Sequence, residues 1–244
     1  MYTSSSILGL VALASTVLSH GLITSPPTRT AGPAMDAACG TSVSALVKAD
    51  NTSHVEDMPE AAALIPGFNS TACNVFLCKG QQFADNTANV QNFTAGQVVN
   101  MRASLPIPHE GPMNVSIIDT ATNTAIGAPL IAFASYADES LAVLPANNTN
   151  FDVTVPSDLN GACSVAGACV MQWFWFGTGA QQTYESVRIM FPGDPLSRGI
   201  IPRAPTLDPV SWCVDFIVPA AAAAAPAAAP ATVADVVADE EDAC

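Results

Sequence analysis

The chain has 244 residues, a formal net charge of −14 and a hydrophobic share of 50%. This length is enough for one large β domain or two small ones, with a sizeable core in either case. Only seven Lys and Arg stand against 21 Asp and Glu. The clustered cations that phosphate binding needs are missing, so nucleic acid is not an expected partner.

Residues 1–19 form a hydrophobic leader whose apolar run, 7–18, is too short to span a bilayer comfortably. Val17-Leu18-Ser19 places small or modest side chains at the positions that a signal peptidase reads. We therefore predict a secretory signal peptide that is cleaved before His20. The mature protein is expected to be extracellular, without a membrane anchor.

A histidine at a free N-terminus can bind a metal, because its α-amine and its own Nδ1 close a chelate ring on one ion. The amine has a pKa of about 7.7–8.0, so a metal can displace its proton near neutral pH. One more imidazole would complete a flat three-nitrogen site, which suits copper. Taken alone, the position of His20 is better explained by chance.

The other two histidines differ in their surroundings. His109 lies in a loop, residues 105–112, in which prolines restrict the backbone on both sides. It is either an ordinary loop histidine or a pre-positioned ligand, and the sequence favours neither. His54 follows a glycosylation sequon and precedes acidic residues, so we expect an exposed loop histidine there.

Six cysteines of the secreted chain are expected to form three disulfides, for which 15 connectivities exist. The short spacing of Cys163 and Cys169 predicts a local bridge between them, and Cys244 is the odd thiol. Five sequons are candidates for N-glycosylation: Asn51, Asn69, Asn92, Asn114 and Asn147.

Short β-rich runs separated by turn residues predict an all-β fold, an antiparallel β-sandwich of immunoglobulin or fibronectin-III type with long loops and short helices. Residues 21–40 are expected to form an irregular arm, with short helices around 43–48 and 60–64. The predicted strands are 98–105, 114–119, 130–133, 151–155, 170–176 and 213–218.

Two segments do not fit the strand pattern. Residues 187–212 hold five prolines and three arginines, so this stretch is predicted to be a long loop or a segment foreign to the mature product. Residues 219–244 form an Ala/Pro-rich acidic tail that is predicted to be disordered. The predicted domain is therefore 20–218, interrupted by 187–212.

A possible ligand pair precedes that interruption. If 181–186 forms a strand, Gln182 and Tyr184 share one face, because side chains alternate along a strand. A tyrosine facing a metal can be a weak axial ligand, and a glutamine beside it can hydrogen-bond an oxygen species. Ordinary sandwich packing is the alternative. Trp173 and Trp175 are expected in the core or beside it.

Together these motifs resemble fungal lytic polysaccharide monooxygenases of auxiliary activity family 16. The resemblance covers His20 to about Val218 without the interruption, and in the family pattern Ser186 runs directly into Cys213. It is carried by the His20-Gly21 start, by the prolines around His109, and by segments 32–40, 77–80, 114–120, 182–186 and 213–216.

The resemblance implies one copper ion held by the amine and Nδ1 of His20 and by Nε2 of His109, with Tyr184 as axial ligand and Gln182 beside it. It implies an electron donor, and oxygen or hydrogen peroxide as co-substrate. Expected substrates are β-1,4-linked polysaccharides, cellulose first and chitin second, cleaved by a monomer. The pairs Cys39–Cys73 and Cys78–Cys213 lean on the same analogy.

Two other functions are compatible with these residues. The chain could bind copper in a histidine brace without oxidising a polysaccharide, or it could be a cell-wall-binding surface protein that has lost catalysis. The presence of Gln182 and Tyr184 favours the enzyme over the copper carrier, whereas the 187–212 interruption favours the surface protein.

Overall fold

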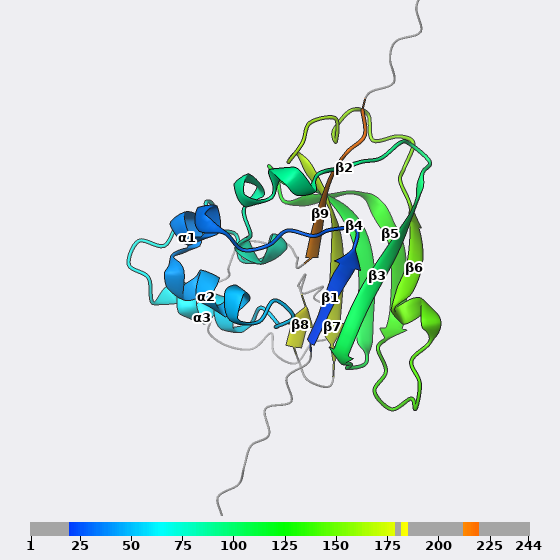
Figure 1. Cartoon of the computed structure of the whole chain (residues 1–244), viewed down its shortest axis with the longest axis horizontal. Helices are drawn as coiled ribbons and strands as arrows, with labels where there is room; N and C mark the ends of the chain where they lie inside the picture. Colours follow the sequence, from blue (N-terminus) through cyan, green and yellow to red (C-terminus); the bar gives the residue numbers. More distant parts are fainter. Residues whose placement is uncertain (1–19, 179–181, 185–211, 220–244) are drawn as a thin grey trace, which may run out of the picture.

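The strands form two packed sheets (Figure 1). The computed structural model describes residues 20–178, 182–184 and 212–219, so the predicted signal peptide and nearly all of the 187–212 segment and the tail lie outside the described part. One sheet has the order β1-β3-β6; the other has the order β2-β9-β7-β4-β5, and β8 pairs with β7. The predicted β-sandwich is confirmed.

All six predicted strands are present, most of them extended at one end or both. The strand pairs are antiparallel except for β2 with β9, which is parallel. The bounds are β1 His20–Ser25, β2 Gln91–Asn92, β3 Val98–Ile107, β4 Gly111–Asp119, β5 Thr124–Tyr136, β6 Asn150–Thr154, β7 Cys169–Gly177, β8 Gln182–Tyr184 and β9 Trp212–Ile217.

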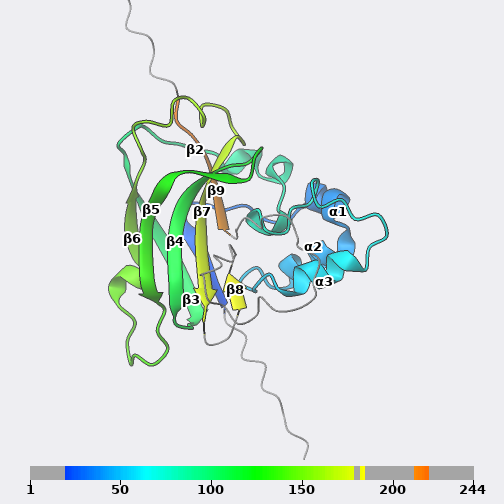
Figure 2. The same cartoon turned by 180° about the vertical axis from the view of Figure 1, so that it is seen from behind.

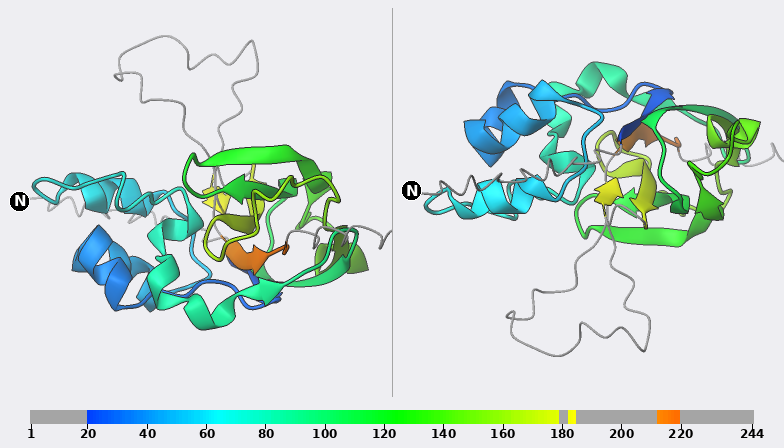
Figure 3. Two further views of the ribbon diagram at one scale, coloured as in Figure 1. Left: turned by 90° about the horizontal axis from the view of Figure 1, so that it is seen from above. Right: turned by 90° about the horizontal axis from the view of Figure 1, so that it is seen from below.

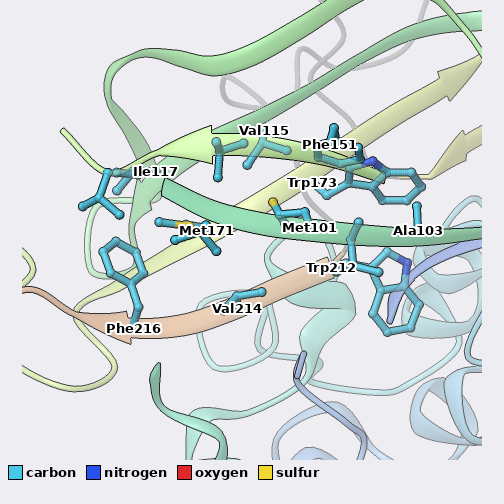
Figure 4. Close-up of a cluster of buried hydrophobic side chains, with 14 of the residues drawn as sticks. Met101, Ala103, Val115, Ile117, Phe151, Met171, Trp173, Trp212, Val214 and Phe216 are labelled. Atoms are coloured by element: carbon cyan, nitrogen blue, oxygen red, sulfur yellow. The ribbon is translucent and has the colours of Figure 1, made fainter. Parts of the chain in front are cut away.

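The main core lies between the two sheets (Figure 4). β3 alternates buried and exposed residues and directs Val99, Met101 and Ala103 into this core. β7 does not alternate, because nearly all of its residues are buried on both faces. Trp173 and Trp175 lie in the core with no exposed surface, as predicted.

A helical region lies beside the sandwich (Figures 1 and 2) and forms its own hydrophobic cluster. It contains α1 Pro33–Cys39, α2 Thr41–Ala49, α3 Asp57–Ala63 and the short 3₁₀ turns η1 Cys78–Gly80, η2 Phe83–Asp85 and η3 Thr87–Asn89; a fourth such turn, η4 Ala146–Asn148, precedes β6. Within the described residues, no helix is long and apolar enough to cross a membrane.

The prediction of an irregular arm over 21–40 is wrong. Its first part is β1, and its second part contains α1, which begins with Pro33 in the first turn where a missing N–H costs nothing. The Asp85 carboxylate accepts hydrogen bonds from the N–H groups of Ala34 and Met35. Both elements therefore depend on partners far away in the sequence.

A buried ion pair joins the segment between β1 and α1 to the larger sheet. Arg29 donates from Nε and Nη2 to the two carboxylate oxygens of Asp215, at 2.8 and 2.7 Å, and both residues are buried. The N–H of Arg29 also donates to the carbonyl of Cys213. Asp215 thus lies on the face of β9 that the segment around Arg29 covers, which explains why this strand is buried on both faces.

Three disulfides are present, and they pair the cysteines as predicted. Cys39–Cys73 joins α1 to the loop after α3, and Cys163–Cys169 closes the loop that leads into β7. Cys78–Cys213 links η1 to β9 across a sequence separation of 135. That bond fixes the helical region to the sheet.

β8 and β9 occupy consecutive parts of one edge of β7. Tyr184 is paired with Trp175, and Trp212 is paired with Trp173, so a single register position separates them. The two strands run in the same direction. They form one strand line, that is, two collinear strands along the same edge of β7, although the whole of 185–211 lies between them in the sequence.

The predicted interruption therefore ends one position too late. Trp212 belongs to β9, is 1% exposed and donates from Nε1 to the carbonyl of Gly21 at 3.0 Å. If the register of β8 continued by two residues, the second of them would come opposite Trp173, which is the position that Trp212 takes. Deleting 186–211 consequently keeps the two halves in register, and so does deleting 187–212.

These two deletions differ in one side chain. Removing 186–211 joins Glu185 to Trp212, whereas removing 187–212 joins Ser186 to Cys213 and loses the Trp212 ring. We expect the first to be more stable by about 3–5 kcal/mol, the usual cost of truncating a buried tryptophan. Urea unfolding of both chains measures the difference.

A deletion that is one residue shorter, 186–210, is the register control. It shifts the joined strand by one position, which turns every side chain to the opposite face. We expect it to be less stable than the deletion of 186–211. Equal stability of these two deletions would show that β8 and β9 are not one strand line.

Candidate functional site

The candidate ligands gather at one end of the sandwich. His20 opens β1 and is paired with Ile107, the last residue of β3, so His109 follows just beyond that partner. β8 lies at the same end (Figures 1 and 3). Its backbone places Tyr184 opposite Trp175 and Gln182 opposite Gly177. The predicted sites thus lie on three adjoining parts of the fold.

Trp175 connects the backbones beside the two histidines. A Cβ atom at Gly21 would lie 2.9 Å from the Trp175 ring, so the ring packs directly against this glycine. Nε1 of Trp175 donates to the carbonyl of His109 at 3.1 Å. One buried side chain therefore fixes the distance between the start of β1 and the His109 loop.

Gly21 is held from two further sides. Its N–H donates to the carbonyl of Thr52, and its carbonyl accepts from Nε1 of Trp212. The ammonium of Lys79 lies 4.7 Å from the centre of the Trp212 ring and donates to the carbonyls of Asn51 and Ser53. His20 is therefore followed by a backbone with little freedom.

The imidazole of His20 is nearly buried and has a carboxylate partner. Its side chain is 12% exposed, and its Nε2 lies 2.8 Å from Oδ2 of Asp50. Oδ1 of Asp50 accepts from the N–H and the hydroxyl of Thr52 at 2.8 and 2.6 Å. Partial burial would raise the pKa of Asp50, but the bonds from Thr52 and the attraction of His20 outweigh it and hold that pKa below its usual value.

His109 shows the opposite arrangement of its nitrogens. Nδ1 lies 3.5 Å from Oε1 of Glu139, whereas Nε2 is buried and has no hydrogen-bond partner among the residues described. The N–H groups of Glu139 itself and of Glu110, together with His109, hold the pKa of Glu139 below its usual value against partial desolvation. The ring is thus oriented, and one nitrogen is left for a ligand.

The two rings fit the nitrogen pattern that the resemblance to the monooxygenase family implies for a brace. The carboxylate of Asp50 lies beside Nε2 of His20, and that of Glu139 lies beside Nδ1 of His109. The predicted metal ligands are the other two nitrogens, Nδ1 of His20 and Nε2 of His109. No group of three His, Cys, Asp or Glu side chains that could hold a metal occurs in the described part of the chain. A brace does not need one, because its third ligand is an amine.

The prediction for His54 is wrong in one respect. Its side chain is only 10% exposed, and Nδ1 lies 3.1 Å from Oε2 of Glu56. The turn between α2 and α3 buries this ring, which a sequence of polar residues does not reveal. Among the sequons, four asparagines are exposed and one is half-buried in a central strand: Asn51, Asn69, Asn92 and Asn147 against Asn114. Glycosylation stays a prediction.

Sequence reasoning missed three residues of this site. Asp50 and Glu139 stand among many acidic residues in loops, and nothing local marks them as partners of histidines. Trp175 was assigned to the core without a role at the site. The signal for each is a contact across the fold: Asp50 follows α2 whereas His20 opens β1, and a sequence separation of 66 lies between Trp175 and His109.

Two solved structures are similar to this chain at low identity and low TM-score. The cellulose-active LPMO CelS2 in complex with copper is 13% identical, with a TM-score of 0.40 over 81% of this chain and 98% of that chain. A chitin-binding domain from Burkholderia pseudomallei is 14% identical, with a TM-score of 0.32 over 64% of this chain and 90% of that chain. No protein family and no curated protein matches.

The indole donors on either side of the site can be removed one at a time. Trp175→Phe leaves the carbonyl of His109 without its partner, and Trp212→Phe does the same to Gly21. We expect each to lower the free energy of unfolding by at least about 1–3 kcal/mol, the cost of an unsatisfied buried acceptor. Urea unfolding measures this, with Val165→Ala, at a 67% exposed position, as the control that should change little.

Proposed function

We propose that the mature chain is a secreted, copper-dependent lytic polysaccharide monooxygenase. The observation that carries the proposal is Nε2 of His109, a buried nitrogen with no partner in the described structure, on a ring whose other nitrogen faces Glu139. Buried polar atoms are almost always hydrogen-bonded, so an exception calls for an explanation. A metal ligand supplies one.

The donor set suits one copper ion. Cleavage before His20 would give an α-amine and an imidazole on the same residue, and His109 would add a third nitrogen. Imidazole and amine nitrogens favour copper over calcium or magnesium, which prefer oxygen. When bound, copper supplies the one-electron chemistry that lets a reductant and oxygen or hydrogen peroxide oxidise a C–H bond beside a glycosidic linkage.

The part of this chain is to hold the donors in place. Hydrogen bonds from Trp175 and Trp212 anchor the backbone next to each histidine, and Glu139 orients the His109 ring. Little rearrangement is then needed when the ligands meet a metal. In this proposal Tyr184 would be a further, weak ligand and Gln182 a hydrogen-bonding neighbour; the strand position of Tyr184 opposite Trp175 supports it.

The proposed substrate is cellulose, with chitin second. Both polymers are neutral, so the acidic surface of this chain does not repel them. Copper binding without oxidation is the alternative, because the nitrogen set alone supports it. Loss of catalysis in a cell-wall-binding protein is a further alternative, favoured by the long segment between β8 and β9.

Copper titration tests the ligand assignment. We expect the chain that begins at His20 to bind one copper ion tightly. His109→Ala should weaken binding by more than about 100-fold, because even the loss of a ligand's hydrogen-bond partner costs 10–100-fold. His54→Ala, a change at a histidine of similar burial, should leave binding unchanged. Calorimetry measures all three.

The amine is tested by one added residue. A glycine placed before His20 moves the free amine away from the imidazole, and we expect copper affinity to fall as in His109→Ala. Incubation with cellulose and ascorbate then tests oxidation by mass spectrometry of the released sugars. Tight copper binding without oxidised products would favour the copper carrier, and equal affinity with and without the added glycine would refute the brace.

A further inference from the structure

We propose that Asp50 is a positioning residue that keeps the proton of the His20 imidazole on Nε2, so that Nδ1 retains its lone pair. The claim about the proton concerns the metal-free protein and stands on the geometry alone. Its consequence for copper rests on the proposed function. Neutral imidazole exists in two tautomers, and which one forms is set by the hydrogen bond of the other nitrogen.

The chemistry of the contact selects one tautomer. An ionised carboxylate only accepts hydrogen bonds. Oδ2 of Asp50 lies 2.8 Å from Nε2 of His20, so that nitrogen must donate and must carry the proton. Both oxygens of Asp50 face hydrogen-bond donors, as an ionised carboxylate requires.

Asp50 is itself held on both sides. Its other oxygen accepts two hydrogen bonds from Thr52, and the carbonyl of Thr52 accepts the N–H of Gly21. Lys79, a fully buried lysine, donates to the carbonyls of Asn51 and Ser53. The loop after α2 is therefore fastened both to the residue that follows His20 and to the body of the protein.

The neighbouring charges do not compete for Asp50. Lys48, which lies just before it in the chain, pairs with Asp36 instead. Arg29 forms its ion pair with Asp215. His109 has the complementary arrangement, with its carboxylate at Nδ1. His20 and His109 thus each have a carboxylate beside the ring nitrogen that the proposed metal does not use.

Substituting asparagine for Asp50 should reverse the tautomer. Three donors face the two carboxylate oxygens: two from Thr52 and one from His20. An amide has one oxygen and one NH₂ group, and NH₂ can only donate. The oxygen is expected to face the N–H and hydroxyl of Thr52, which turns the NH₂ toward His20. Nε2 must then accept, and the proton moves to Nδ1.

The experiment reads the tautomer directly in copper-free protein. The chain beginning at His20 is labelled with ¹⁵N-histidine, and long-range ¹H–¹⁵N spectra are recorded at about pH 8.5 so that the neutral ring is observed. We expect the Nε2–H form in the wild type and the Nδ1–H form in Asp50→Asn. Asp36→Asn, which removes a carboxylate paired with Lys48, should keep the wild-type tautomer.

Each result decides the proposal. A wild-type ring protonated on Nδ1, or the same tautomer in the wild type and in Asp50→Asn, overturns it, and the wild-type spectrum suffices if the variant does not fold. Copper titration follows as a separate measurement, in which Asp50→Asn should lose about 10–100-fold in affinity. If the wild type shows Nε2–H but binds no copper, the proposed function fails while the role of Asp50 holds.

Discussion

The packing of Trp175 is the constraint on which the site depends. This ring has no exposed surface, touches Gly21 so closely that no larger residue fits there, and donates to the carbonyl of His109. Its backbone is paired with that of Tyr184. One residue of β7 therefore contacts or pairs with all three segments that carry candidate ligands. A rigid element of this kind holds donor atoms more accurately than loops could by themselves.

A second layer of contacts determines which nitrogen of each ring is left for a ligand. Asp50 and Glu139 lie on loops far apart in the sequence, one after α2 and one after β5. They meet the two histidines at different nitrogens. Carboxylates in this position orient metal-binding histidines and set their tautomers. The site is thus built from the sandwich and from the helical region together.

That cooperation explains why the helical region is attached so firmly. The Cys78–Cys213 disulfide and the buried pair of Arg29 with Asp215 both fix it to β9. β9 in turn contributes Trp212, which holds Gly21. A shift of the helical region relative to the sheet would move Asp50 away from His20. The stability of this junction and the geometry of the site are one property of the fold.

The sequence by itself determined the elements whose signal is local. Short runs of β-branched and aromatic residues between turn residues located six strands, and the short spacing of Cys163 and Cys169 predicted one disulfide. The N-terminal place of His20 and the prolines around His109 marked both histidines as candidates. Residues 21–40 were misjudged, because β1 and α1 form through distant partners such as β3 and Asp85.

Only the tertiary structure decided how the candidates are completed. Acidic loop residues are common, so the sequence could not choose Asp50 and Glu139, which become partners when β3, β5 and α2 bring their ends together. It also could not place Trp212, since a proline-rich stretch precedes it and its strand partner, Trp173, comes much earlier in the chain. The physical reason is the same in each case: local patterns report periodicity and burial, whereas a hydrogen bond between distant residues exists only after the chain has folded.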